Sequence, residues 1–249
     1  MSLARYLARL GYGSRREMER RLRLGDITHV DGTRLTDAAS CAHHELRIGG
    51  EPLDPPPGVV ILLHKPVGYV CSTQDRPPLV YDLLPPRFPH RTPVMATVGR
   101  LDADTSGLLL LTDDGDLNHR LSSPRHHVPK TYRVELAEPL RGDEGASFGS
   151  GTLRLQGEAT PLKPADLLVV SDRLAELTIH EGRYHQVRRM FAAVGNHVAA
   201  LTRIALGPLT LGTMPPGSWR VLTPEEVDRL RQPPPAPPNT PSSNPERTV

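Results

Sequence analysis

Cysteine and long apolar runs are both scarce in this chain of 249 residues. The two cysteines, Cys41 and Cys71, are too few for a disulfide framework or a cysteine-rich zinc site. No apolar run approaches the length needed to span a bilayer, and the N-terminus carries no signal-peptide pattern. We therefore expect a cytoplasmic protein that makes no use of the membrane.

Motifs for cofactors and metals are also missing. The sequence has no Walker or Rossmann glycine pattern, and its 11 histidines do not fall at the spacing of a metal motif. We expect neither a cofactor nor a metal. A chain of this length can bury one good core and a small accessory domain.

Positive charge is concentrated at the N-terminus, although the whole chain has a net charge of only +2. Residues 1–23 contain seven arginines against two glutamates. A solvated helix face usually mixes the two signs more evenly, whereas clustered arginine is typical of a phosphate-binding face. We expect RNA contacts from this cluster, which includes Arg5, Arg9, Arg15, Arg16 and Arg20.

The N-terminal segment predicts two short helices and a small β element. Apolar residues from Leu3 to Leu10 recur at helical spacing, and a capping box of Ser14 and Glu17 opens a second helix that runs to about Leu24. Strand and turn signals follow at 27–32, and a further short strand is expected after the Asp31-Gly32 turn. This arrangement resembles the S4 RNA-binding domain, so residues 1–54 are assigned to an S4-like domain.

A proline-rich linker at about 52–58 separates this domain from a larger one at 58–231. Strands are expected at 59–63, 108–112, 132–136 and 174–179, and helices at 184–194 and from Thr223 onward. They interleave without a βαβ repeat, which favours a mixed or antiparallel α+β sheet. Residues 232–249 hold seven prolines and are expected to be disordered.

One short segment, residues 99–108, places the carboxylate of Asp102 in a tight turn ahead of an apolar strand. Three interpretations compete. Asp102, Asp104, Ser106, Gly107 and Asp113 follow calcium-loop spacing, but the flanking segments are strand-like instead of helical. The turn could equally hold Asp102 for local hydrogen bonds. A carboxylate fixed on a rigid element is also a candidate nucleophile.

Motifs elsewhere in the chain bear on that choice. Gly99-Arg100-Leu101-Asp102, with Thr105 and the following leucines, resembles the signature of the pseudouridine synthases in their RsuA/RluB branch. Four further segments resemble that family's other motifs in the same order: His64 to Thr73, Ser122 to His127, Lys130 to Tyr132, and Glu181 to Met190. The resemblance runs from about residue 1 to residue 231.

The resemblance implies a function and a set of residues. The implied reaction converts a uridine to pseudouridine without any cofactor or metal. Asp102 would be the catalytic carboxylate, Tyr132 would stack on the base, and Arg188 would keep Asp102 ionised. Arg100 would occupy the space of the flipped base. The sequence fits attack on the sugar, attack on the ring or a glycal route equally.

Further contacts and the substrate follow from the same resemblance. Loop residues expected to contact RNA are Arg125, His126, His127, Lys130 and Arg183. The motifs around Cys71 and His126 look most like those of the enzymes that modify small-subunit (16S) rRNA. A monomer acting on 16S rRNA within an assembling small subunit (pre-30S) is the expected state.

Two alternatives stay open within the same fold: an enzyme of the same branch acting on 23S rRNA, and a non-catalytic rRNA-binding factor for ribosome assembly. A glycosidase is disfavoured. Such enzymes need two positioned carboxylates, and neither Asp104 nor Asp113 has an evident acid role.

Overall fold

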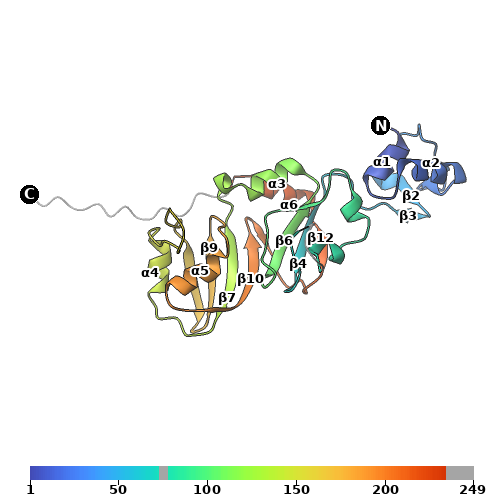
Figure 1. Ribbon diagram of the computed structural model, residues 1–249. Coiled ribbons are helices and arrows are strands. Elements are labelled where there is room, and N and C mark those ends of the chain that lie inside the picture. Colours follow the sequence, from blue (N-terminus) through green and yellow to red (C-terminus); the bar gives the residue numbers. More distant parts are fainter. Residues whose placement is uncertain (73–77, 234–249) are drawn as a thin grey trace, which may run out of the picture.

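The computed structural model describes residues 1–72 and 78–233, and its two parts are joined by one extended segment (Figure 1). The first part contains α1 (Leu3–Arg9), α2 (Arg15–Leu24), β1 (Ile27–His29), the 3-10 turn η1 (His43–Glu45), β2 (Leu46–Ile48) and β3 (Glu51–Pro52). The strands form an antiparallel sheet in the order β1-β2-β3.

The two N-terminal helices begin and end where the sequence predicts. The Ser14 hydroxyl accepts the backbone N–H of Glu17, and Gly25 closes α2 at a φ of +75°. Leu7, Met18 and Ile27 are fully buried in a separate small core. The strand expected after the Asp31-Gly32 turn was wrong, because only one bridge, between Thr28 and Arg34, forms there.

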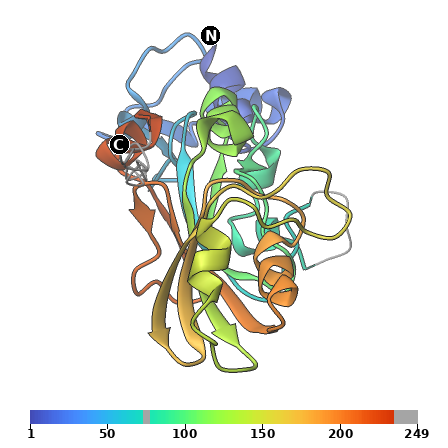
Figure 2. The ribbon, with the colours of Figure 1, turned by 90° about the vertical axis from the view of Figure 1, so that its left-hand side faces the viewer.

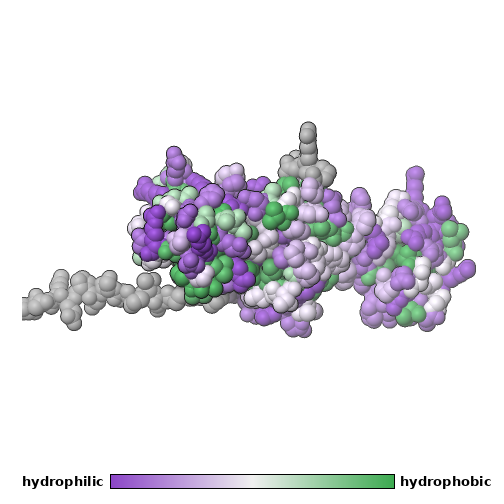
Figure 3. Space-filling view, turned by 90° about the horizontal axis from the view of Figure 1, so that it is seen from below, coloured by the Kyte–Doolittle hydropathy of each residue, from purple (hydrophilic) through white to green (hydrophobic). Residues whose placement is uncertain are grey.

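Two ion pairs hold the linker where the N-terminal part meets the larger one. Arg87 contacts Asp54 at 2.7 Å and lies over the ring of Tyr12. Arg91 contacts Asp113 at 3.0 Å and donates to the carbonyls of two linker residues, Pro55 and Pro56. In the space-filling view the N-terminal part forms a separate lobe with a largely hydrophilic visible face (Figure 3).

The larger part is built on a nine-stranded mixed sheet in the order β12-β4-β6-β10-β7-β9-β8, with β5 beside β6 and β11 beside β10. The strands are β4 (Val60–Lys65), β5 (Ala96–Thr97), β6 (Ser106–Thr112), β7 (Lys130–Leu136), β8 (Asp166–Ser171), β9 (Leu174–Ile179), β10 (Val198–Leu206), β11 (Leu209–Thr210) and β12 (Trp219–Val221). The expected α+β class is confirmed.

Helices cover both faces of this sheet. They are α3 (Gly115–Ser122), α4 (Glu144–Gly149), α5 (Gln186–Ala193) and α6 (Pro224–Arg231), with 3-10 turns at Val80–Leu83, Phe88–His90 and Pro124–His126. Phe148 of α4 and Phe191 of α5 pack edge to face in the core on one side. Figure 2 shows the two helices, α4 in yellow-green and α5 in orange, next to each other. Leu117 of α3 and Leu230 of α6 pack in the core on the other. The leucines of β6 alternate between the two cores.

The parallel pair of β6 and β10 puts two distant segments in contact beside the turn of Asp102. Thr202 pairs with Ser106, and Arg203 pairs with Gly107. A Cβ at Gly107 would lie 2.3 Å from the Arg203 carbonyl oxygen, and the φ of Gly107 is +112°. Glycine is therefore required where these strands meet.

Some predicted element boundaries were wrong. The expected 184–194 helix begins later, at Gln186, because His185 has a left-handed φ of +47° and precedes the first turn. The expected 132–136 strand begins earlier, so Lys130 lies in a strand and not in a loop. Thr223 caps α6 as expected. No helix in residues 1–72 or 78–233 is long and apolar enough to cross a membrane. Thr73 and the tail from residue 234 lie outside the described residues.

Candidate active site

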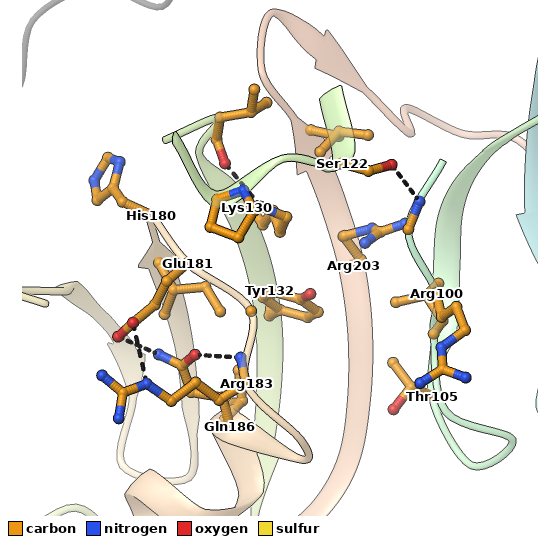
Figure 4. A pocket seen from close by; sticks show the side chains of 18 of the residues that line it. Arg100, Thr105, Ser122, Lys130, Tyr132, His180, Glu181, Arg183, Gln186 and Arg203 are labelled. Atoms are coloured by element: carbon orange, nitrogen blue, oxygen red, sulfur yellow. Dashed lines mark hydrogen bonds and ion pairs between the residues drawn. The ribbon is translucent and has the colours of Figure 1, made fainter. Parts of the chain in front are cut away.

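A cavity of about 360 Å³ opens beside the turn of Asp102. Its walls come from four segments far apart in the sequence: residues 98–105, 121–132, 179–188 and 201–206. Tyr132 lies between Arg183 and Gln186 on one side and Thr105 and Arg100 on the other (Figure 4). The cavity therefore gathers the motif residues of the sequence in one place.

Asp102 lies in a turn that is closed by backbone hydrogen bonds, which do not involve its side chain. The backbone N–H of Thr105 donates to the Asp102 carbonyl at 3.1 Å, and that of Gly68 donates to the Ala103 carbonyl at 2.7 Å. The Asp102 carboxylate is 39% exposed and lines the cavity. Within the described residues it makes no local hydrogen bond, which argues against the purely structural interpretation of the turn.

Lys65, which the sequence reasoning missed, hydrogen-bonds to the backbone of this turn. Its ammonium group is fully buried and donates to the carbonyls of Pro66, Ala103 and Thr105. Burial lowers the pKa of Lys65, and the carboxylates of Asp102 and Asp104 partly oppose that shift. A lysine at the end of an apolar strand is the sequence signal that could have identified it.

His185 is the ionisable partner closest to Asp102 among the described side chains. Its Nε2 lies 3.5 Å from Oδ1 of Asp102. The ring stacks on the exposed ring of Tyr184, with centroids 3.9 Å apart. A non-glycine residue at positive φ is a strained conformation that concentrates at functional sites. His185 was absent from our sequence-based list of site residues.

Arg188, the cation expected to keep Asp102 ionised, contacts Asp104 and not Asp102 in this structure. The Nη2 of Arg188 contacts the carboxylate of Asp104 at 3.0 Å and its carbonyl at 3.1 Å, and Nη1 donates to the Val198 carbonyl. Asp104, for which the sequence suggested no acid role, is thus the partner of Arg188. The Nε of Arg188 is buried and has no hydrogen-bond partner among the described residues.

Tyr132 lies on the floor of the cavity, where the resemblance places an aromatic. It belongs to β7, which is flanked by β9 and β10, and pairs in register with Leu177 and Arg203. Its side chain is 8% exposed and still lines the cavity. A flat ring fixed on a central strand can pack against a planar base.

The residues of the larger part that are expected to contact RNA differ in their surroundings. Arg100, His127 and Lys130 line the cavity, and Arg125 and His126 lie exposed on the neighbouring 3-10 turn. Arg183 is used differently. Its guanidinium contacts Glu158 and Glu181 and the carbonyls of Thr160 and Pro161. Arg183 thereby fixes the cavity wall, and most of its donors are not free for phosphate in this structure.

The N-terminal arginines lie mostly exposed on α1 and α2. Arg5, Arg16 and Arg20 are exposed and form no ion pair within the described chain, whereas Arg15 pairs with Glu19. Arg9 donates to the Thr92 carbonyl across the junction with the larger part. Apart from Arg9, these side chains offer an accessible basic surface.

The calcium interpretation of the turn has no support in the geometry. Asp113, the last residue of the calcium pattern, is bound to Arg91, and Ser106 bonds Thr202. In residues 1–72 and 78–233 no group of three histidine, cysteine or carboxylate side chains is arranged to hold a metal.

Comparisons with known proteins find similar sequences and a similar fold over most of this chain. Residues 59–193 match the family described as RNA pseudouridylate synthase. Ribosomal small subunit pseudouridine synthase A of Escherichia coli K12 is 43% identical over 91% of this chain and 98% of its own length. The same enzyme of Yersinia pestis is 42% identical over 94% and 99%. A crystal structure of a pseudouridylate synthase superposes with a TM-score of 0.66 and 37% identity, covering 92% of this chain and 99% of the other.

Proposed function

This chain belongs to the RNA pseudouridylate synthases, and on that premise we propose that it isomerises one uridine of 16S rRNA, at a position like uridine 516. The observation that carries the proposal is the convergence of Asp102, Tyr132 and Arg188 on one cavity. The small-subunit assignment is supported by relatives that match nearly the full length of both chains.

The reaction requires one bond exchange and no net change in composition. The bond from ribose C1′ to uracil N1 breaks, the base turns, and C1′ joins C5. The proton on C5 is lost, and N1 gains one. The carboxylate of Asp102 assists the departure of the base, and the exposed side of the turn lets a nucleotide reach it.

The base must leave its stack before it can enter the cavity. Flipping costs a few kcal/mol, which contacts inside the protein offset. Tyr132, which lines the cavity, supplies the flat surface for the base, and its phenol is the group that takes the C5 proton. Arg100, exposed beside the turn, fills the space that the base leaves. The buried Nε of Arg188 is a donor for Asp102 or for the uracil once the cavity is filled.

Affinity for the RNA backbone comes from the N-terminal part. Exposed arginines on α1 and α2 contact phosphates without reading sequence, so binding weakens steeply as salt rises. The shape of the rRNA in a partly assembled small subunit then selects the uridine.

The decisive test replaces the carboxylate. Asp102→Asn and Asp102→Ala are expected to abolish pseudouridine in rRNA from a deletion strain complemented with each variant, while RNA affinity stays within a few-fold of wild type. Asp116→Asn, which removes an exposed carboxylate from α3, is the matched control and retains full modification. Unchanged modification with Asp102→Ala contradicts the proposal.

Mapping small- and large-subunit rRNA in the same strains identifies the substrate. Loss of one site in 16S rRNA supports the proposal, and loss of a site in 23S rRNA overturns the small-subunit assignment. RNA binding with no release of tritium from 5-tritiated uridine, in naked rRNA or pre-30S particles, would indicate a non-catalytic assembly factor instead.

A further inference from the structure

Charge in the cavity is unbalanced. Two acidic residues, Asp102 and Glu181, line the cavity, and Glu181 is engaged by Arg183, Gln186 and the backbone of Lys163. Lys130 and Arg203 line the same cavity. Neither forms an ion pair within the described residues, and their hydrogen bonds go to backbone carbonyls.

Arg203 is the more unusual of the two cations. It is 2% exposed, and its Nε donates to the Leu108 carbonyl at 2.7 Å. Its Nη2 is buried without a hydrogen-bond partner in the described part of the chain. A buried guanidinium with a free donor is costly unless something binds it. Figure 4 shows this side chain at the cavity wall near Tyr132.

Lys130 shares the same surroundings. Its ammonium donates to the Val128 carbonyl at 3.0 Å. Burial, and in second place the charge of Arg203, lower the pKa of Lys130 to about 8. It therefore stays mostly protonated at neutral pH, although no anion compensates it. Two neighbouring cations held in this way favour an anionic ligand.

Taking the proposed function as its basis, we propose that Lys130 and Arg203 form a subsite for a phosphate group of the flipped nucleotide. Arg203 pairs in register with Tyr132, so a phosphate bound there lies next to the site of the base. The subsite would anchor the backbone of the flipped nucleotide while the base turns. This assigns Arg203, which the sequence reasoning missed, to substrate binding.

The test compares uridine 5′-monophosphate, uridine 3′-monophosphate and uridine as probes, with binding followed by protein-observed NMR. In the wild type, at least one nucleotide is expected to bind about 10-fold more tightly than uridine, because charge-assisted hydrogen bonds are added. The isomer that binds more tightly than uridine shows whether the 5′ or the 3′ phosphate occupies the subsite. The preference is expected to vanish in Lys130→Gln and to weaken in Arg203→Lys.

Arg133→Gln is the matched control, because Arg133 belongs to the same strand but is exposed and pairs with Glu176 away from the cavity. It is expected to keep the full preference. Equal binding of all three probes to the wild type, or a preference that survives in Lys130→Gln, overturns the subsite. If Arg203→Lys does not fold, Lys130→Gln still decides.

Failure of the subsite and failure of the proposed function are separable, because probe binding requires no turnover. A wild type that modifies rRNA but shows no nucleotide preference refutes only the subsite. A wild type that prefers the nucleotide but modifies no rRNA refutes only the function.

Discussion

Arg188 contacts Asp104 at two points, the carboxylate at 3.0 Å and the backbone carbonyl at 3.1 Å. Asp104 lies two residues after Asp102 in the same turn. The ion pair therefore ties α5 to the turn that presents Asp102, the carboxylate that we propose to be catalytic. On that proposal, Arg188 acts on Asp102 through the position of the turn and through its charge.

The first prediction concerns this pair. Asp104→Asn removes the negative charge of one contact and leaves the contact to the backbone carbonyl, so we expect the single-turnover rate to fall only about 3- to 10-fold, or about 1 kcal/mol. Arg188→Gln removes both contacts and the positive charge, and we expect a loss of 100-fold or more. Tritium release under single-turnover conditions measures both. A larger loss in Asp104→Asn than in Arg188→Gln contradicts this account.

The second prediction concerns Lys65. Lys65→Met leaves carbonyls of the turn without their buried donor, so the free energy of unfolding is expected to fall by about 1–3 kcal/mol. The rate should fall as well, because the turn of Asp102 loses its support. Urea denaturation and tritium release measure the two effects. RNA affinity, which we propose depends mainly on α1 and α2, should stay unchanged, and a selective loss of affinity would argue against a positioning role.

Local features of this protein were readable from the sequence, because neighbours in the chain determine them. The turn of Asp102, the Ser14 and Thr223 caps and the buried β6 depend on residues a few positions apart. The start of α5 was misplaced because His185 takes a left-handed conformation that helical periodicity does not report.

Long-range features of this protein could not be predicted from the sequence. Arg203 reaches the cavity because β10 pairs in parallel with β6, about 95 residues earlier in the chain. Lys65 meets the turn of Asp102 across 40 residues. The choice of Asp104 over Asp102 as the partner of Arg188 depends on the placement of α5. Each of these requires the completed sheet.

The third prediction compares two ion pairs at the junction of the two parts. Arg91 and Asp113 are 1% and 2% exposed, and Asp113 also accepts the N–H of Gly58. Asp113→Asn leaves a buried guanidinium without its counter-charge, so a loss of about 3–5 kcal/mol in the free energy of unfolding is expected.

The Arg87–Asp54 pair is the control at the same junction, because Arg87 is 45% exposed. Arg87→Gln is expected to cost about 1 kcal/mol or less. Denaturant unfolding of the two variants measures the contrast. Equal losses would mean that burial does not determine the strength of these pairs.

The last prediction is a pH dependence at Lys130. Its pKa is about 8 in the folded protein, against an ordinary value of 10.5. Below pH 8 both the folded and the unfolded chain bind this proton, and the folded chain carries the full cost of a buried charge. Between about pH 8 and 10.5 only the unfolded chain binds it, so the unfavourable contribution of Lys130 diminishes as the pH rises.

Lys130→Met removes that charge. The free energy of unfolding is therefore expected to rise by about 1–3 kcal/mol at pH 7 relative to the wild type, and the gain is expected to shrink toward zero by pH 10.5. Urea denaturation of both proteins across this range measures the difference, and subtraction cancels the other titrating groups. A gain that does not change with pH would show that packing, and not the buried charge, is responsible. The same variant should lose catalytic rate, because the proposed phosphate subsite loses one of its two cations.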